Sequence, residues 1–135
     1  TGTPPPPDAT KTTDEQNGEK AMNDFVIACS PAMEEVLSIT GTYNEKSLTD
    51  TEWSKTLLGK LGTFDKACGA YDVETVPVTL QTVNFILGMG AEKCAETSLT
   101  LRDAISNKDD LEFILGTSKL NDARFLLAGA VAYGK

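Results

Sequence analysis

Histidine is absent from all 135 residues of this chain. Because histidine is the usual general acid or base near neutral pH and the commonest ligand of transition metals, its absence argues against most hydrolytic and metal-dependent sites. The paired acids Glu34 with Glu35 and Glu92 with Glu96 fall outside the apolar positions, so we interpret them as solvated surface groups. We therefore expect a protein that is not an enzyme and needs no cofactor.

Long apolar runs and positive charge are also scarce. No stretch approaches the roughly 18 apolar residues that a membrane-spanning helix requires. Lysine and arginine number 12 against 20 aspartates and glutamates, which gives a net charge of −8. An acidic body repels phosphate backbones, so we expect no nucleic-acid partner and no membrane span. A protein partner is expected, and a basic one would suit this acidic surface.

Cysteine occurs only at Cys29, Cys68 and Cys94, and no pair has the CxxC spacing of a redox or zinc motif. All three fall on apolar helical stripes, so the preferred interpretation is three buried free thiols. A Cys29–Cys68 disulfide with Cys94 free is the alternative. Antiparallel helices place those two cysteines about 10 Å apart along the axis, a gap that a stagger or a bend at Pro31 would close.

The first 18 residues contain no large apolar side chain and cannot offset their ordering entropy. We predict a disordered, proline-rich tail over residues 1–18 and a folded domain over residues 19–135. Pro4 to Pro7 should form a short polyproline II segment. Its nearest basic residue, Lys11, lies beyond an acidic one, so a flexible tail is preferred over an SH3 ligand.

The chain begins at Thr1, without an initiator methionine or a signal peptide. We interpret this start as the product of processing, which predicts an exported or extracellular protein, with an organelle lumen as the alternative.

Apolar residues recur at spacings of three and four in several segments, the pattern of amphipathic helices. Pro31 is expected to bend the first helix rather than end it, and Thr49 with Glu52 has the capping-box pattern. The fold class is therefore all-α, a compact bundle of about five or six helices. The expected segments are 19–41, 53–71, 78–97, a short helix near 101–105, 107–115 and, after a turn at 116–118, 121–133.

Oxygen ligands gather at Asn107, Asp109, Asp110 and Glu112, but the EF-hand glycine and glutamate positions are missing. Capping of a helix N-terminus explains these residues, so we predict no metal site.

Small residues form two helical faces, which indicates either tight packing, the preferred interpretation, or a space for an apolar ligand between helices. The residues of this candidate face are Met89, Gly90, Ala91, Cys94, Gly129 and Ala130.

The segment from Phe125 to Tyr133 contains no polar residue. A helix that is apolar on all sides is normally covered on all sides, so we expect it to be the central helix of a monomer. A dimer through this C-terminal helix is the alternative.

These features favour a non-enzymatic, secreted, acidic helical protein that acts by binding another protein, as an effector, an inhibitor or a docked subunit. The alternative is a carrier of a small apolar ligand or lipid held between helices. A proline-rich N-terminus before a helical bundle resembles the lumenal extrinsic subunits of photosystem II. This resemblance is one of arrangement and covers no motif; it implies docking on a larger assembly, and the acidic charge departs from it.

Overall fold

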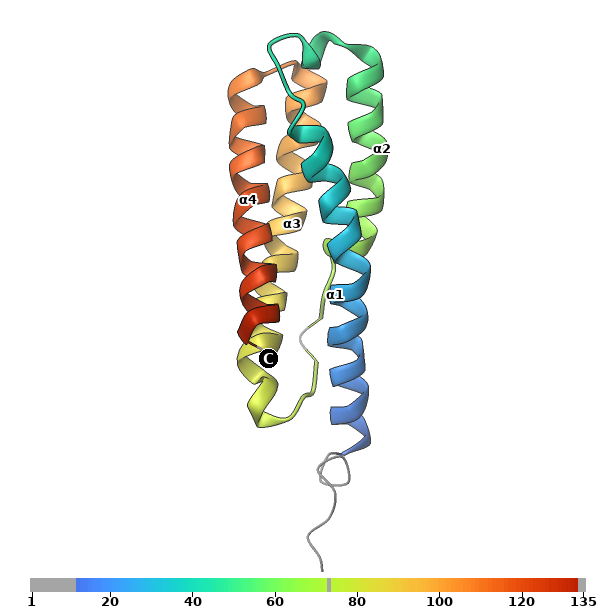
Figure 1. The fold of residues 1–135 in the computed structure, drawn as a ribbon, viewed down its shortest axis with the longest axis vertical. Helices are drawn as coiled ribbons and strands as arrows, with labels where there is room; N and C mark the ends of the chain where they lie inside the picture. Colours follow the sequence, from blue (N-terminus) through green and yellow to red (C-terminus); the bar gives the residue numbers. More distant parts are fainter. Residues whose placement is uncertain (1–11, 73, 134–135) are drawn as a thin grey trace, which may run out of the picture.

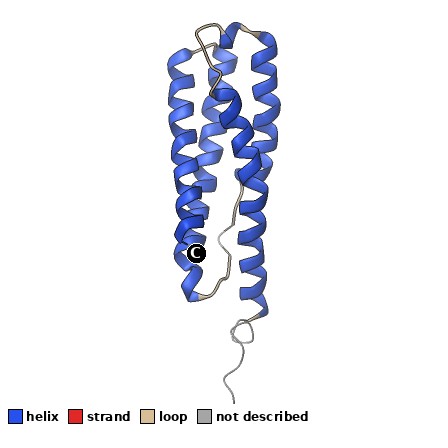
Figure 2. Ribbon diagram, in the orientation of Figure 1, coloured by secondary structure: helices blue, strands red, loops and turns tan. Residues whose placement is uncertain are grey.

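The computed structural model describes residues 12–72 and 74–133, and the regular elements within them are all helical. Four α-helices run up, down, up and down to form one bundle (Figures 1 and 2). They are α1 (Thr13–Thr40), α2 (Thr51–Cys68), α3 (Gln81–Asn107) and α4 (Asp110–Tyr133), with single 3₁₀ turns η2 (Ser47–Thr49) and η3 (Val78–Leu80) before α2 and α3. The all-α bundle is confirmed, but the described residues form four α-helices rather than five or six.

The count differs because α3 and α4 each continue through a predicted break. Gly116, expected in a turn, lies inside α4, and a Cβ there would overlap the side chain of Leu101. Glycine at this position allows α3 and α4 to approach closely rather than ending a helix. The actual turn is at Lys108, whose φ of 52° is left-handed and whose N–H bonds the Ala104 and Ile105 carbonyls.

Helix α1 begins at Thr13, earlier than the expected domain boundary at residue 19. Thr12 caps it, since its hydroxyl accepts from the Glu15 N–H at 3.0 Å while the Glu15 carboxylate accepts from the Thr12 N–H. Gly18 is buried where the α2–η3 connection crosses α1, and a Cβ there would overlap the Thr75 carbonyl. Residues 13–18 are therefore part of α1, and Gly18 contacts the α2–η3 connection. The proline segment predicted for the tail lies outside the described residues.

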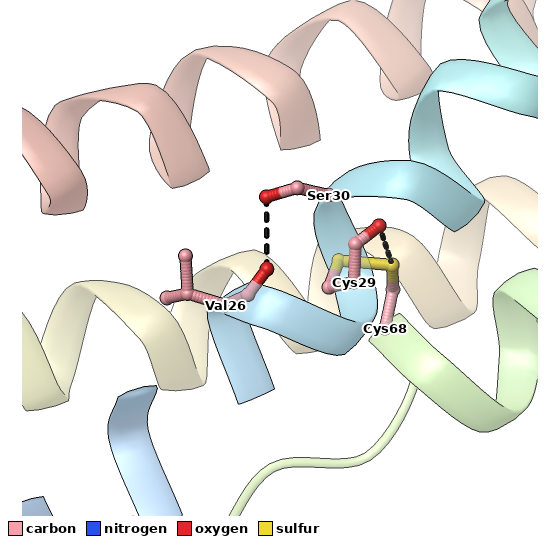
Figure 3. The surroundings of a disulfide bond; sticks show 4 residues. All are labelled: Val26, Cys29, Ser30 and Cys68. Carbon is pink, nitrogen blue, oxygen red and sulfur yellow. Dashed lines mark hydrogen bonds between the residues drawn. A yellow bond between two sulfur atoms is a disulfide. The ribbon is translucent and has the colours of Figure 1, made fainter. Parts of the chain in front are cut away.

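Pro31 lies inside α1, which continues through it as expected for a bent helix. Figure 1 shows α1 changing direction near its middle. The Ser30 hydroxyl donates to the Val26 carbonyl at 2.8 Å (Figure 3), a bond that accompanies bending in helices. Asp50 is the N-cap of α2, and its carboxylate accepts from the Glu52 and Trp53 N–H groups. The predicted Thr49 cap is therefore displaced by one residue.

The core between the helices includes Leu57, Leu61 and Phe64, all fully buried. At one end of the bundle, Tyr43 stacks on Phe113 with ring centroids 4.2 Å apart. Trp53 joins them, and its indole N–H donates to the Thr42 hydroxyl at 2.9 Å.

The expectation that the last helix is central is wrong. Helix α4 is an outer helix that packs mainly on α3 and touches α1 much less, and Phe125 is 80% exposed. A bundle of four helices gives each helix two neighbours, so its outward face has nothing to cover it. The monomer was expected because the other helices were thought to cover the last helix on all sides. Since they do not, that reason no longer holds. No helix within the described ranges is long and apolar enough to cross a bilayer.

Candidate functional site

The side of the bundle between α1 and α4 is incompletely closed. A hollow of about 490 Å³ lies there, floored by the start of α3. Its lining is mostly apolar, and we call it the lower hollow. The residues are Glu19, Met22, Asn23, Val26 and Ile27 of α1, Leu80 of η3, Val83 and Leu87 of α3, and Ala130 and Val131 of α4.

Two further hollows follow the same pair of helices. One of about 370 Å³, the middle hollow, shares Val131 with the lower hollow and contains Met33 and Leu127. Another of about 290 Å³ lies at the far end, where Leu37 and Phe113 face it. The three together define what we call the α1–α4 groove.

The groove combines a buried floor with an exposed apolar rim. Met22, Val83 and Leu87 at the floor are buried. Ile27 and Val131 at the rim are 70% and 39% exposed. Apolar rim residues above an apolar floor are the arrangement that a bound hydrocarbon would cover.

The middle hollow is lined by two residues of opposite charge, Glu34 of α1 and Arg124 of α4. Both side chains are exposed. Within the described part of the chain Arg124 makes no ion pair, so its guanidinium is available to an anionic group beside the groove.

The structure divides the small-residue face predicted from the sequence. Gly90, Ala91, Cys94 and Ala130 are buried, whereas Met89 and Gly129 are exposed. Gly90 and Cys94 border a void too small to hold a water molecule. Of the six residues, only Ala130 reaches the lower hollow. A Cβ on Gly129 would meet nothing within 4 Å, so this glycine serves no close packing within the described chain.

Met22 and Leu87 lie on apolar helical stripes, a pattern that by itself predicts core residues. They become a groove only because α1 and α4 stand apart. One signal was available: Ile27 is a large apolar residue off the buried stripe of α1.

The structure joins Cys29 of α1 and Cys68 of α2 by a disulfide, and Cys94 of α3 is a buried free thiol. The preferred expectation of three free thiols does not describe this structure. Counted from the ends that the α1–α2 connection joins, Cys68 lies about 9 Å further along its helix than Cys29. Figure 1 shows that connection running past the end of α1 before α2 begins, which brings the two cysteines level.

The sulfur atoms of all three cysteines lie within 4.8 Å of one another. The Cys68 sulfur is also 3.3 Å from the Cys29 carbonyl oxygen (Figure 3), a contact without a proton because a disulfide sulfur carries none. Burial raises the pKa of the Cys94 thiol to about 12, since a thiolate is poorly solvated in an apolar interior.

The acids considered for calcium have structural partners. The Asp109 carboxylate accepts from the Glu112 N–H at 3.1 Å, which caps α4. The Asp110 carboxylate accepts from the Tyr43 hydroxyl. That hydrogen bond is the main reason the pKa of Tyr43 rises to about 12, with smaller contributions from desolvation and from the negative charge of Asp110. Asp109 thus caps α4 as predicted, whereas Asp110 is hydrogen-bonded to Tyr43.

Comparison of the chain with family models, characterised proteins and solved structures finds no match. The geometry of the α1–α4 groove and of the three cysteines therefore carries the functional argument.

Proposed function

We propose that this protein is a non-enzymatic binding protein that holds a single-chain apolar ligand, such as a fatty acid, in the α1–α4 groove. The observation that carries the proposal is the lower hollow, with its volume of about 490 Å³ and its buried apolar floor. Pockets for small ligands are typically about 300–1,000 Å³, mostly apolar and few per protein.

The shape of the groove favours a thin chain over a protein segment. An α-helix with its side chains is about 10–12 Å across, too wide to reach a floor that α1 and α4 already shield from solvent. A hydrocarbon chain can enter between the two helices and follow them from the lower to the middle hollow, which meet at Val131.

The expected affinity is moderate. Each buried methylene contributes about 0.8 kcal/mol, so about ten of them supply roughly 8 kcal/mol, which corresponds to a dissociation constant in the micromolar range before ordering costs. Arg124 beside the middle hollow suits a carboxylate at the end of such a chain.

The test is binding of a long-chain fatty acid to the full chain, measured by native mass spectrometry and by displacement of a fluorescent fatty acid. Val131→Phe, which narrows both hollows, should weaken binding at least tenfold. Val78→Phe is the matched control, because Val78 is 79% exposed and lines neither hollow. Equal affinity of the two variants, or no fatty-acid binding by the unmodified protein, contradicts the proposal.

A second candidate, binding of another protein, is favoured by the outward face of α4. Exposed positions there follow spacings of four and three, the pattern of a helix that pairs with another helix. Phe125 and Leu111 on this face are each 80% exposed. The positions are Leu111, Leu115, Ser118, Asp122, Phe125, Gly129 and Ala132.

We propose an apolar helix as the partner for this face, which a second copy of the chain would supply in the simplest case. Sedimentation at micromolar concentration should then show a dimer that Phe125→Asp abolishes. A monomer at all concentrations, with no change in Phe125→Asp, removes the support for self-association.

We also propose that the protein works in an oxidising compartment, outside the cell or in an organelle lumen. The Cys29–Cys68 disulfide supports this, because disulfides persist where thiols are not kept reduced. Thiol counting on protein isolated with rapid acid quenching and alkylation tests it: one reactive thiol per unfolded chain is expected, and three would contradict the proposal.

A further inference from the structure

Three helices each bring one sulfur atom to the same buried point. Cys29, Cys68 and Cys94 come from α1, α2 and α3, and each is at most 2% exposed. Their sulfur atoms lie within 4.8 Å of one another. Figure 3 shows the two cysteines of the disulfide facing each other across α1 and α2. The disulfide uses only Cys29 and Cys68, so it does not explain why Cys94 lies beside them.

We propose that, when the disulfide is reduced, these three cysteines form a three-coordinate site for a soft, thiophilic ion. Three sulfur ligands at about 2.3 Å from a pyramidal three-coordinate ion lie roughly 3.5 Å apart. The sulfur atoms are already close to that arrangement, and reduction lets the bridged pair move apart toward it. Soft sulfur ligands of this kind select thiophilic ions over magnesium or calcium.

The reduction step needs an external reductant, here a water-soluble phosphine. The phosphine and one water convert the disulfide into two thiols, and the phosphine leaves as its oxide. No other bond of the chain changes. The reduced site then holds three thiols and no charge.

The surroundings of the site favour an ion of charge three. Cys29 and Cys94 border a void, lined also by Phe25, Met33, Leu87 and Leu127, that is too small for water. A net charge in such an apolar interior is costly. Three thiolates with a trivalent ion form a neutral group, whereas a monovalent ion leaves two negative charges. Trivalent arsenic meets this condition: arsenous acid and three thiols give a neutral arsenic trithiolate and three waters.

The experiment uses the full chain, reduced with the phosphine, freed of it without air and titrated with arsenite. Native mass spectrometry should show one arsenic per chain, with all three thiol protons lost and no hydroxyl retained on the ion. Alkylation in denaturant at neutral pH should find no reactive thiol in the complex, because all three sulfur atoms are bound to arsenic. Cys94→Ala should weaken binding at least tenfold and leave a hydroxyl on the bound arsenic. Leu99→Ala, at an exposed position of the same helix, is the control and should bind as the unmodified chain does.

Several outcomes would overturn this site. One is a complex in which Cys94 still reacts; another is equal affinity of Cys94→Ala and the unmodified chain. Stoichiometric binding of monovalent copper without binding of arsenite would contradict the choice of a trivalent ion. A reduced chain that loses its helical circular dichroism and does not regain it with arsenite would also overturn the proposal, because the site requires the folded bundle.

Discussion

Helix α4 meets the rest of the molecule along two seams that differ sharply. Against α3 the seam is closed, and Gly116 is so near Leu101 that a Cβ would overlap its side chain. Against α1 the seam is open, and three hollows follow it from end to end. Both seams use the same apolar helix, so its hydrophobicity does not decide which face is covered.

The difference between the two seams shows that a seam closes only where the backbones of its two helices approach each other closely. A short turn at Lys108 joins α3 and α4, and small residues let these helices approach. Helices α1 and α4 have no such connection, and the α2–η3 segment anchors α1 at Gly18 instead. An apolar helix held on one side and spaced from its other neighbour leaves a groove between them.

The largest effect on the free energy of unfolding is expected for two phenylalanines of α4, each replaced by alanine. Phe113 is 1% exposed and stacked on Tyr43, whereas Phe125 is 80% exposed. Phe113→Ala should cost about 3–5 kcal/mol of the free energy of unfolding, and Phe125→Ala should change it by less than about 0.5 kcal/mol. Urea unfolding at low protein concentration measures both. A loss above 2 kcal/mol for Phe125→Ala would mean that something covers the outward face of α4.

A second comparison tests how α1 is held beside the open seam. Gly18→Ala should destabilise the fold by about 1–3 kcal/mol, because the new Cβ would overlap the Thr75 carbonyl. Gly59→Ala on α2 meets nothing within 4 Å and should stabilise it by about 0.5–1 kcal/mol through helix propensity. Thermal and urea unfolding give both values. If Gly18→Ala is neutral or stabilising, the anchoring of α1 by the α2–η3 segment is wrong.

The smallest effect concerns the far end of the open seam, where Tyr43 is bonded to Asp110 of α4. The pKa of Tyr43, raised from 10.0 to about 12, should fall toward 10 in Asp110→Asn, which replaces the charged hydrogen-bond acceptor with a weaker neutral one and removes the negative charge. A raised pKa means that the folded state keeps the proton longer. Its contribution to stability is therefore present below pH 10 and is lost as the pH rises through about 12.

Ultraviolet titration of the phenolate, with the unfolded chain as the reference, follows this change. Identical titration curves for Asp110→Asn and the unmodified protein would show that the Tyr43–Asp110 contact does not close this end of the seam.

Sequence pattern was sufficient for the helical class because apolar periodicity is a local property of each segment. It also predicted a helix that continues through Pro31 and capping acids near Asp109, both of which depend on neighbours within a few residues. Local pattern failed at Gly116, where glycine resembles a turn signal but allows contact with Leu101 of another helix. It failed likewise at Gly18, whose neighbour Thr75 is far away in the sequence.

The chain by itself determined an acidic, histidine-free, all-helical domain, since composition and periodicity require no knowledge of packing. Only the tertiary structure decided that Phe125 faces outward, that Ile27 and Val131 border a groove, and that Cys29 and Cys68 are level with each other. These outcomes depend on the spacing and the axial offset of whole helices. Those quantities are set by connections and by contacts between residues distant in the sequence, which a single apolar stripe does not specify.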